Sequence, residues 1–269
     1  MDTYLSLLIT ISSFFLTTLP LSHGKEGDYY TACSTTYNCG DLTNISYPFW
    51  GQNRSRYCGG SDMLKLTCDQ NGTTSIEIGS QNFTVLSIYQ SPFTVRLARK
   101  DLVLSSCISD NTSLDSTVFY YNPDKVENLT LFYNCPQRVS ESLPGDFKNN
   151  FTCHNESSKC DERAFYVDQT QLRKYEEQLL DCGVQVQVPV LRDVPLGDGG
   201  GIQALRQLLE HGFDVLYYSV SDFPSCVACD ASGGKCGRRF TNTFLFSCHC
   251  RDGAHDLMCP QKGMISLLF

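Results

Sequence analysis

The sequence predicts a β-rich N-terminal domain followed by a small α+β domain, with disulfides in both. Three observations support this fold class. Fifteen cysteines are spread between Cys33 and Cys259 in a chain of 269 residues. Apolar and polar residues alternate with a period of two over much of the first half, which is typical of half-buried strands. In the second half, segments with helical spacing alternate with short strand patterns.

Residues 1–24 have the features of a secretory signal peptide. Residues 4–22 carry no charge, and a step of small residues around Gly24 is followed by Lys25 and Glu26. The segment lacks the usual N-terminal Lys or Arg, and it is just long enough to span a bilayer as a retained anchor. We expect cleavage near Gly24 and a product that is secreted to the cell exterior or the cell wall. Membrane association is the alternative if the segment is retained.

The cysteines predict disulfides, because an exported chain meets an oxidising compartment and a cytosolic chain would keep its thiols reduced. Cys226-x2-Cys229 has the spacing of zinc ligands, but disulfides are the favoured interpretation in a secreted chain. Spacing leaves the connectivity open, and an odd number leaves at least one thiol without an intrachain partner. The disulfide candidates are Cys33, Cys39, Cys58, Cys68, Cys107, Cys135, Cys153, Cys160, Cys182, Cys226, Cys229, Cys236, Cys248, Cys250 and Cys259.

Potential N-glycosylation sites support the same compartment. The Asn-x-Ser/Thr pattern is far more frequent than chance would give, and all its occurrences lie before residue 156. One part of the molecule is therefore expected to carry sugars and the other to be bare. The predicted sites are Asn44, Asn53, Asn71, Asn82, Asn111, Asn128, Asn150 and Asn155.

Residues 30–136 are predicted to form the first domain, a small antiparallel β structure with three disulfides. Apolar residues alternate around Leu66, Ile76, Val95 and Leu131, and turn residues such as Asn71-Gly72 separate these runs. Residues 137–150 are polar, contain Pro144-Gly145 and are predicted to be a linker.

Residues 151–260 are predicted to form the second, α+β domain, followed by a tail at 261–269. A helix is expected from Asp168 to Cys182, with a stop at Gly183, because its apolar residues recur at helical spacing. A strand is expected over 184–190, a second helix over 202–210 ending at Gly212, and a strand over 213–218.

Charge and motifs narrow the function. The formal net charge is −8 and no basic stripe is present, so nucleic acid is disfavoured as a partner. The chain has no Gly-x-Ser-x-Gly elbow and no His-Glu-x-x-His motif. We therefore expect no catalytic residues, no resident metal and no cofactor.

Two groups of motifs resemble the extracellular part of plant wall-associated receptor kinases, in the branch of the leaf-rust-resistance-like receptor kinases. The first resembles their galacturonan-binding domain, and it comprises Cys33-x5-Cys39-Gly40, Asn44-Ile-Ser-Tyr-Pro-Phe-Trp-Gly51, Tyr57-Cys58-Gly59 and Leu66-Thr67-Cys68. The second resembles their C-terminal wall-associated kinase domain, and it comprises Cys226-Val-Ala-Cys229, Lys235-Cys236-Gly237 and Phe246-Ser-Cys248-His-Cys250. Such proteins continue into a transmembrane helix and a kinase, whose motifs are not found in this sequence.

The resemblance implies binding of polygalacturonan, a polymer of carboxylates, hydroxyls and apolar sugar faces. Arginine can grip a carboxylate bidentately, and aromatic rings can cover sugar faces. The aromatic residues near a proline and cystines could equally be core, and the arginines could be solvated surface groups. The candidate ligand-binding residues are Tyr47, Phe49, Trp50, Arg54, Arg56 and Tyr57, with Lys65, Arg96, Arg99 and Lys100 as a possible basic strip.

Residues 25–135 hold eight Lys/Arg and eleven Asp/Glu, a net charge of −3. An anionic polymer would therefore need a local basic patch or calcium that bridges it to the protein. We expect non-catalytic binding of pectin or oligogalacturonide by a kinase-less ectodomain, with a membrane receptor ectodomain as a further partner. The alternative is a secreted protein-interaction or peptide-sensing module, acting as a decoy or defence factor without carbohydrate affinity.

Overall fold

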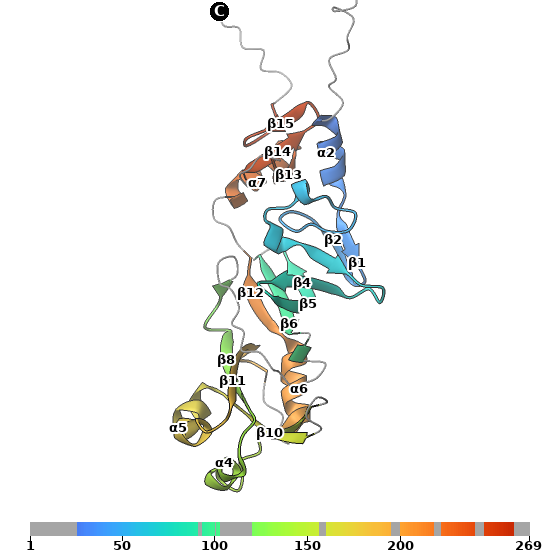
Figure 1. Ribbon diagram of the computed structural model, residues 1–269. Helices are drawn as coiled ribbons and strands as arrows, with labels where there is room; N and C mark the ends of the chain where they lie inside the picture. The colour runs from blue at the N-terminus through green and yellow to red at the C-terminus, as the bar shows by residue number, and fades with distance from the viewer. Residues whose placement is uncertain are drawn as a thin grey trace, which may run out of the picture.

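The computed structural model describes residues 26–90, 93–99, 101–102, 120–155, 160–194, 200–217, 222–239 and 245–260. The molecule is elongated and consists of three tiers stacked along its length (Figure 1). A cystine-rich tier lies at one end, a six-stranded sheet lies in the middle, and a four-stranded sheet with its helices forms the other end. The predicted leader and the tail at 261–269 lie outside the described residues.

The middle tier is an antiparallel sheet with strand order β3-β4-β5-β6-β12-β7. Its apolar residues alternate as predicted, and one face buries a core that includes Ile76, Phe83, Leu97 and Val215. The residues between these core positions form the opposite, outer face, which is lined by polar side chains at the β3 edge. The strands are β3 Leu66–Cys68, β4 Thr74–Ile78, β5 Gln81–Tyr89, β6 Thr94–Arg99, β7 Tyr120–Tyr121 and β12 Phe213–Leu216.

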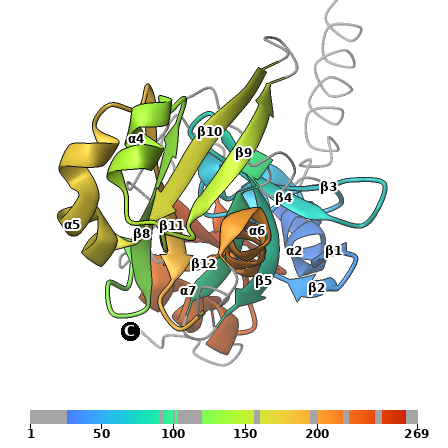
Figure 2. The same cartoon turned by 90° about the horizontal axis from the view of Figure 1, so that it is seen from below.

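The four-stranded sheet, with order β11-β8-β10-β9, is covered by helices on both faces (Figure 2). One face packs Phe132, Phe165 and Val167 against the α4 and α5 side, and the other packs Leu131 and Val188 against α6. The elements are β8 Val126–Tyr133, β9 Asn150–Asn155, β10 Cys160–Val167, β11 Val184–Leu191, α4 Gln137–Ser142, α5 Gln169–Leu179 and α6 Gly201–His211.

Helix α5 forms where the sequence predicted it. Asp168 caps its N-terminus, because the Asp168 carboxylate accepts a hydrogen bond of 2.7 Å from the Gln171 backbone N–H. Leu172, Tyr175, Leu179 and Cys182 share the face that packs against the sheet. Helix α6 ends at Gly212, whose φ of +66° is a conformation that glycine adopts at little cost.

The cystine-rich tier combines both ends of the described chain. Helix α2 contacts η1 and all three strands β13, β14 and β15, so the N-terminal helix packs against the C-terminal sheet (Figure 1). Its elements are α2 Glu26–Ser34, η1 Arg56–Cys58, α7 Asp222–Ala231, β13 Lys235–Arg238, β14 Phe246–Cys250 and β15 Gly253–His255. Between this tier and the six-stranded sheet lie β1 Tyr37–Cys39, β2 Leu42–Ile45 and η2 Asp62–Leu64.

The predicted division at residues 137–150 does not coincide with the division between the sheets. Strand β8 precedes this segment but lies in the four-stranded sheet, whereas β12 follows it but pairs with β6 and β7. The segment itself contains helix α4. Alternation identifies a strand and its buried face, but it carries no information about which distant strand completes the sheet.

Six disulfides are formed among the described residues, and they confirm the disulfide interpretation over a zinc site for the C-terminal cysteines. The expectation of three bridges within the first domain is corrected, since Cys135 pairs with Cys182 across the predicted boundary. Cys153 is also disulfide-bonded, and Cys107 lies outside the described residues. The bridges are Cys33–Cys58, Cys39–Cys68, Cys135–Cys182, Cys226–Cys236, Cys229–Cys248 and Cys250–Cys259.

Among the described helices, none combines the length and the apolar character needed to cross a bilayer.

The sheet pairing predicts that the first half does not fold alone. A fragment ending at residue 150 lacks β12 and the C-terminal sheet, so the core around Leu97 and the helix α2 would be exposed to water. We expect no cooperative thermal unfolding of this fragment by circular dichroism, whereas residues 26–260 unfold cooperatively. A sharp two-state transition of the short fragment would show that β12 is dispensable.

Candidate functional site

A groove of about 410 Å³ crosses the outer face of the six-stranded sheet at its β3 edge. Strand alternation creates it, because Leu66, Ile76 and Ile78 point into the core and their neighbours point outward. Two cross-strand pairs, Thr67 with Ser75 and Glu77 with Asn82, provide its floor. The groove is lined by Asp62, Met63, Lys65, Thr67, Ser75, Glu77, Gly79 and Asn82.

Trp50 supports the groove from behind Lys65. Its indole N–H donates a hydrogen bond of 2.7 Å to the Ser61 carbonyl, and backbone hydrogen bonds link Trp50 to Leu64 and Leu66. The Lys65 ammonium lies 5.8 Å from the centre of the indole ring, within cation–π distance. Gly59 packs so closely that any side chain there would collide with the ring. The half-buried Trp50 therefore orients Lys65 at the groove.

Asp62 closes one side of the groove and is held by two arginines. Arg56 Nε donates to Asp62 Oδ1 at 2.7 Å, and buried Arg238 donates to the same oxygen at 2.6 Å. These hydrogen bonds, that of Arg56 first, lower the pKa of Asp62 to about 2. Arg238 also donates to the Arg56 carbonyl at 3.0 Å. The Asp62 carboxylate is thus already neutralised by the protein.

Arg54 lies in the interior, with 2% of its surface exposed. Its guanidinium donates to four backbone carbonyls, those of Cys33, Thr35, Phe49 and Cys58. Burial lowers its pKa to about 10, an effect that the charge of Asp230 opposes. Arg54 therefore joins helix α2 to the following loop, and its side chain does not reach the surface where a polysaccharide would lie.

The three other aromatic candidates pack against neighbouring parts of the protein. Phe49 is fully buried against Tyr217, with ring centres 4.7 Å apart. Tyr47 meets Phe246 edge-on at 6.0 Å, and Tyr57 meets Tyr29 edge-on at 4.6 Å. Phe49 is core, while Tyr47 and Tyr57 are half-buried at the contact with the C-terminal sheet.

The arginines of the predicted basic strip are paired with carboxylates. Arg96 makes a bidentate ion pair with Asp214, at 2.7 and 2.9 Å, and buried Arg99 pairs with Asp101. Lys100 lies outside the described residues. Lys65 also belongs to the predicted strip. Its side chain is exposed and lines the groove.

Two family models match the chain. The wall-associated receptor kinase galacturonan-binding model matches residues 33–99, and the wall-associated receptor kinase C-terminal model matches residues 152–253. The chain resembles the ectodomain of the wall-associated and leaf-rust-resistance-like receptor kinases. All residues that line the groove lie within the segment that the galacturonan-binding model matches.

Several receptor-like kinases of Arabidopsis thaliana are similar to this ectodomain-like chain. The leaf rust 10 disease-resistance locus receptor-like protein kinase-like 1.4 is 28% identical over 81% of the chain, which spans 30% of that relative. The kinase-like 2.3 is 31% identical over 87% of the chain and 36% of the relative, and the kinase-like 1.2 is 30% identical over 96% and 38%. The chain thus spans well under half of these relatives. No solved structure matches it significantly.

Six of the predicted glycosylation sites have exposed asparagine side chains, which is the geometry that glycosylation requires. They are Asn44, Asn53, Asn71, Asn82, Asn128 and Asn150. Asn111 and the side chain of Asn155 lie outside the described residues. Asn82 lines the groove, so a glycan on it would sit at the groove's end.

Sequence reasoning missed Asp62, Glu77 and Arg238. Arg238 is 176 residues from Asp62, and their proximity depends on the return of the C-terminal sheet to helix α2. Glu77 and Ser75 could have been found, because they occupy the polar positions between Ile76 and its alternating neighbours.

The contacts of Arg54 predict that Arg54→Ala destabilises the protein strongly, by about 3 kcal/mol or more, because buried carbonyls lose charged donors. Arg173→Ala is the matched control, since Arg173 is exposed on helix α5 and its loss should change the midpoint little. Urea unfolding of both variants measures this difference. Equal midpoints would mean that Arg54 has no structural role.

The pKa of Asp62 predicts a specific loss of stability in acid. Its folded-state pKa is about 2, below the usual value, so its contribution is complete above about pH 4 and is lost as the pH falls towards 2. Asp62→Asn should remove this part of the pH dependence in urea unfolding, whereas exposed Asp41→Asn should retain it. An unchanged profile for Asp62→Asn would contradict the assigned ion pairs.

Proposed function

We propose that the chain binds polyuronate of the plant cell wall in the groove between Asp62 and Asn82, without catalysis, as an extracellular receptor-type ectodomain. The observation that carries the proposal is the position of the groove, which lies wholly within the segment matched by the galacturonan-binding model. The groove is open to solvent, and polar side chains of strands β3, β4 and β5 line it, which suits a ligand rich in hydroxyl groups.

The charged residues of the groove are those that would contact the uronate carboxylates. Asp62 is shared by Arg56 and Arg238, so this cluster carries one positive charge in excess, and the other charges of the lining are those of Lys65 and Glu77. Lys65 would pair with one carboxylate, held in place by the Trp50 ring. Glu77 would repel the next carboxylate, unless a calcium ion bridges the two carboxylates. Calcium would then arrive with the polymer and not as a resident cofactor.

Isothermal titration with oligogalacturonides, with and without calcium, tests this proposal. Lys65→Glu should weaken binding at least about tenfold, because it replaces the attraction with repulsion. Lys125→Glu is the control, because this substitution changes the net charge by the same amount. Lys125 is exposed in the turn before β8 and lies outside the groove. Glu77→Gln should strengthen binding without calcium and abolish the gain that calcium gives.

Absence of binding to any uronate, with or without calcium, would overturn the proposal. That result would favour the alternative of a module that recognises proteins or peptides.

A further inference from the structure

A row of side chains crosses the outer face of the six-stranded sheet, at the edge away from the groove. Tyr89 of β5 pairs with Thr94 of β6, Thr94 pairs with Leu216 of β12, and Leu216 pairs with Tyr120 of β7. Directly paired residues project from the same face of a sheet. The register therefore places two tyrosines and a leucine side by side on one surface, from strands far apart in sequence.

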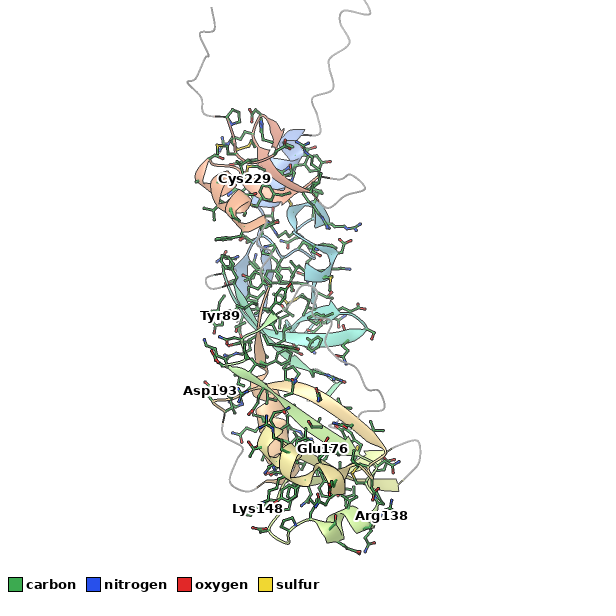
Figure 3. All side chains as sticks on the ribbon, turned by 90° about the vertical axis from the view of Figure 1, so that its left-hand side faces the viewer. Tyr89, Arg138, Lys148, Glu176, Asp193 and Cys229 are labelled. Atoms are coloured by element: carbon green, nitrogen blue, oxygen red, sulfur yellow. A yellow bond between two sulfur atoms is a disulfide. The ribbon has the colours of Figure 1, made fainter. Side chains whose placement is uncertain are left out.

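Burial confirms that this is the outer face. The alternating residues Val95 and Val215 are fully buried, whereas Tyr89 is 49% and Tyr120 is 54% exposed. Figure 3 shows Tyr89 at the surface of the middle tier. Neighbouring strands are about 4.8 Å apart, so the two tyrosines are separated by about 14 Å across three strand spacings. That distance suits a chain of several sugar rings.

The next row on the same face is polar but electrically balanced. Ser87 pairs with Arg96, and Arg96 pairs with Asp214. The Arg96 guanidinium donates two hydrogen bonds to the Asp214 carboxylate, at 2.7 and 2.9 Å. The hydrogen bonds to Asp214 and, to a smaller extent, the negative charge of nearby Asp193 raise the pKa of Arg96. The guanidinium is committed to a protein carboxylate, and the surroundings are slightly acidic.

This combination selects among ligands. A uronate would meet an arginine that is already paired with Asp214 and a second carboxylate, that of Asp193, so it would be disfavoured. A neutral sugar could lay its apolar face on a tyrosine ring and hydrogen-bond its hydroxyls to the ion pair, where lone pairs and N–H groups remain. The galacturonan-binding match includes Tyr89, Thr94 and Arg96, so half of this surface lies in a carbohydrate-binding type of domain.

We propose that the surface formed by Tyr89, Thr94, Leu216 and Tyr120, with the Arg96–Asp214 pair, binds a chain of neutral pyranose sugars. This second site is separate from the polyuronate groove, which lies at the β3 edge of the same sheet. The ectodomain would then contact two chemically different wall polysaccharides at once, one charged and one neutral.

Titration of the whole ectodomain with cellohexaose and galactohexaose tests the second site. Tyr89→Ala and Tyr120→Ala should each weaken binding of the better ligand by roughly threefold to tenfold, because each removes one stacking surface. Leu180→Ala is the control, since Leu180 is an exposed apolar residue on the four-stranded tier. Oligogalacturonide affinity should be unchanged in both tyrosine variants, and Lys65→Glu should leave neutral-sugar affinity unchanged.

Three outcomes would overturn the second site. One is that neither neutral hexasaccharide binds, and another is that the tyrosine variants bind it as well as the unaltered chain does. The third is a dimer in sedimentation velocity that Tyr89→Ala dissolves, because the face would then join two copies of the chain. Thermal unfolding of each variant shows whether a loss of binding is caused by a loss of folding. Tyr89→Gln provides a second replacement, with a polar side chain.

Discussion

The pairing of β12 with β6 and β7 is the constraint on which the rest of the molecule depends. It brings Phe213 and Val215 into the core of a sheet whose other strands lie more than 90 residues earlier. The chain then continues from β12 to the C-terminal sheet that packs on helix α2 (Figure 1). The Arg238–Asp62 ion pair and the surface that contains Leu216 and Tyr120 depend on this return.

Most of the arginines that the sequence offered for ligand binding are used by the protein itself. Arg54 holds backbone carbonyls, while Arg56, Arg96, Arg99 and Arg238 pair with carboxylates. Long-range attraction for an acidic polymer is thus weak, in keeping with the formal charge of −8. The carbohydrate binding that we propose therefore relies on local contacts, namely a lysine beside a tryptophan ring, polar strand faces and exposed tyrosines.

Much of the local structure could be predicted from the sequence. Strands β4, β6, β8 and β11 follow apolar alternation, and α5 and α6 follow helical spacing with a cap at Asp168 and a stop at Gly212. The partners of these elements could not be predicted, because Val215 has the same alternation whichever strand it joins. The candidate site was predicted in part. Trp50 and Lys65 border the groove, but Arg54 was assigned to the surface by proximity in sequence, and only three-dimensional packing shows its burial.

Amide hydrogen exchange in the presence of oligogalacturonide tests the central claim most directly, namely that the outer face of strands β3 to β5 is the polyuronate-binding surface. The account predicts slower exchange in residues 62–67 and 73–82, with no change in the four-stranded sheet. Slower exchange confined to α7 and β13–β15, or no change anywhere at saturating ligand, would contradict it.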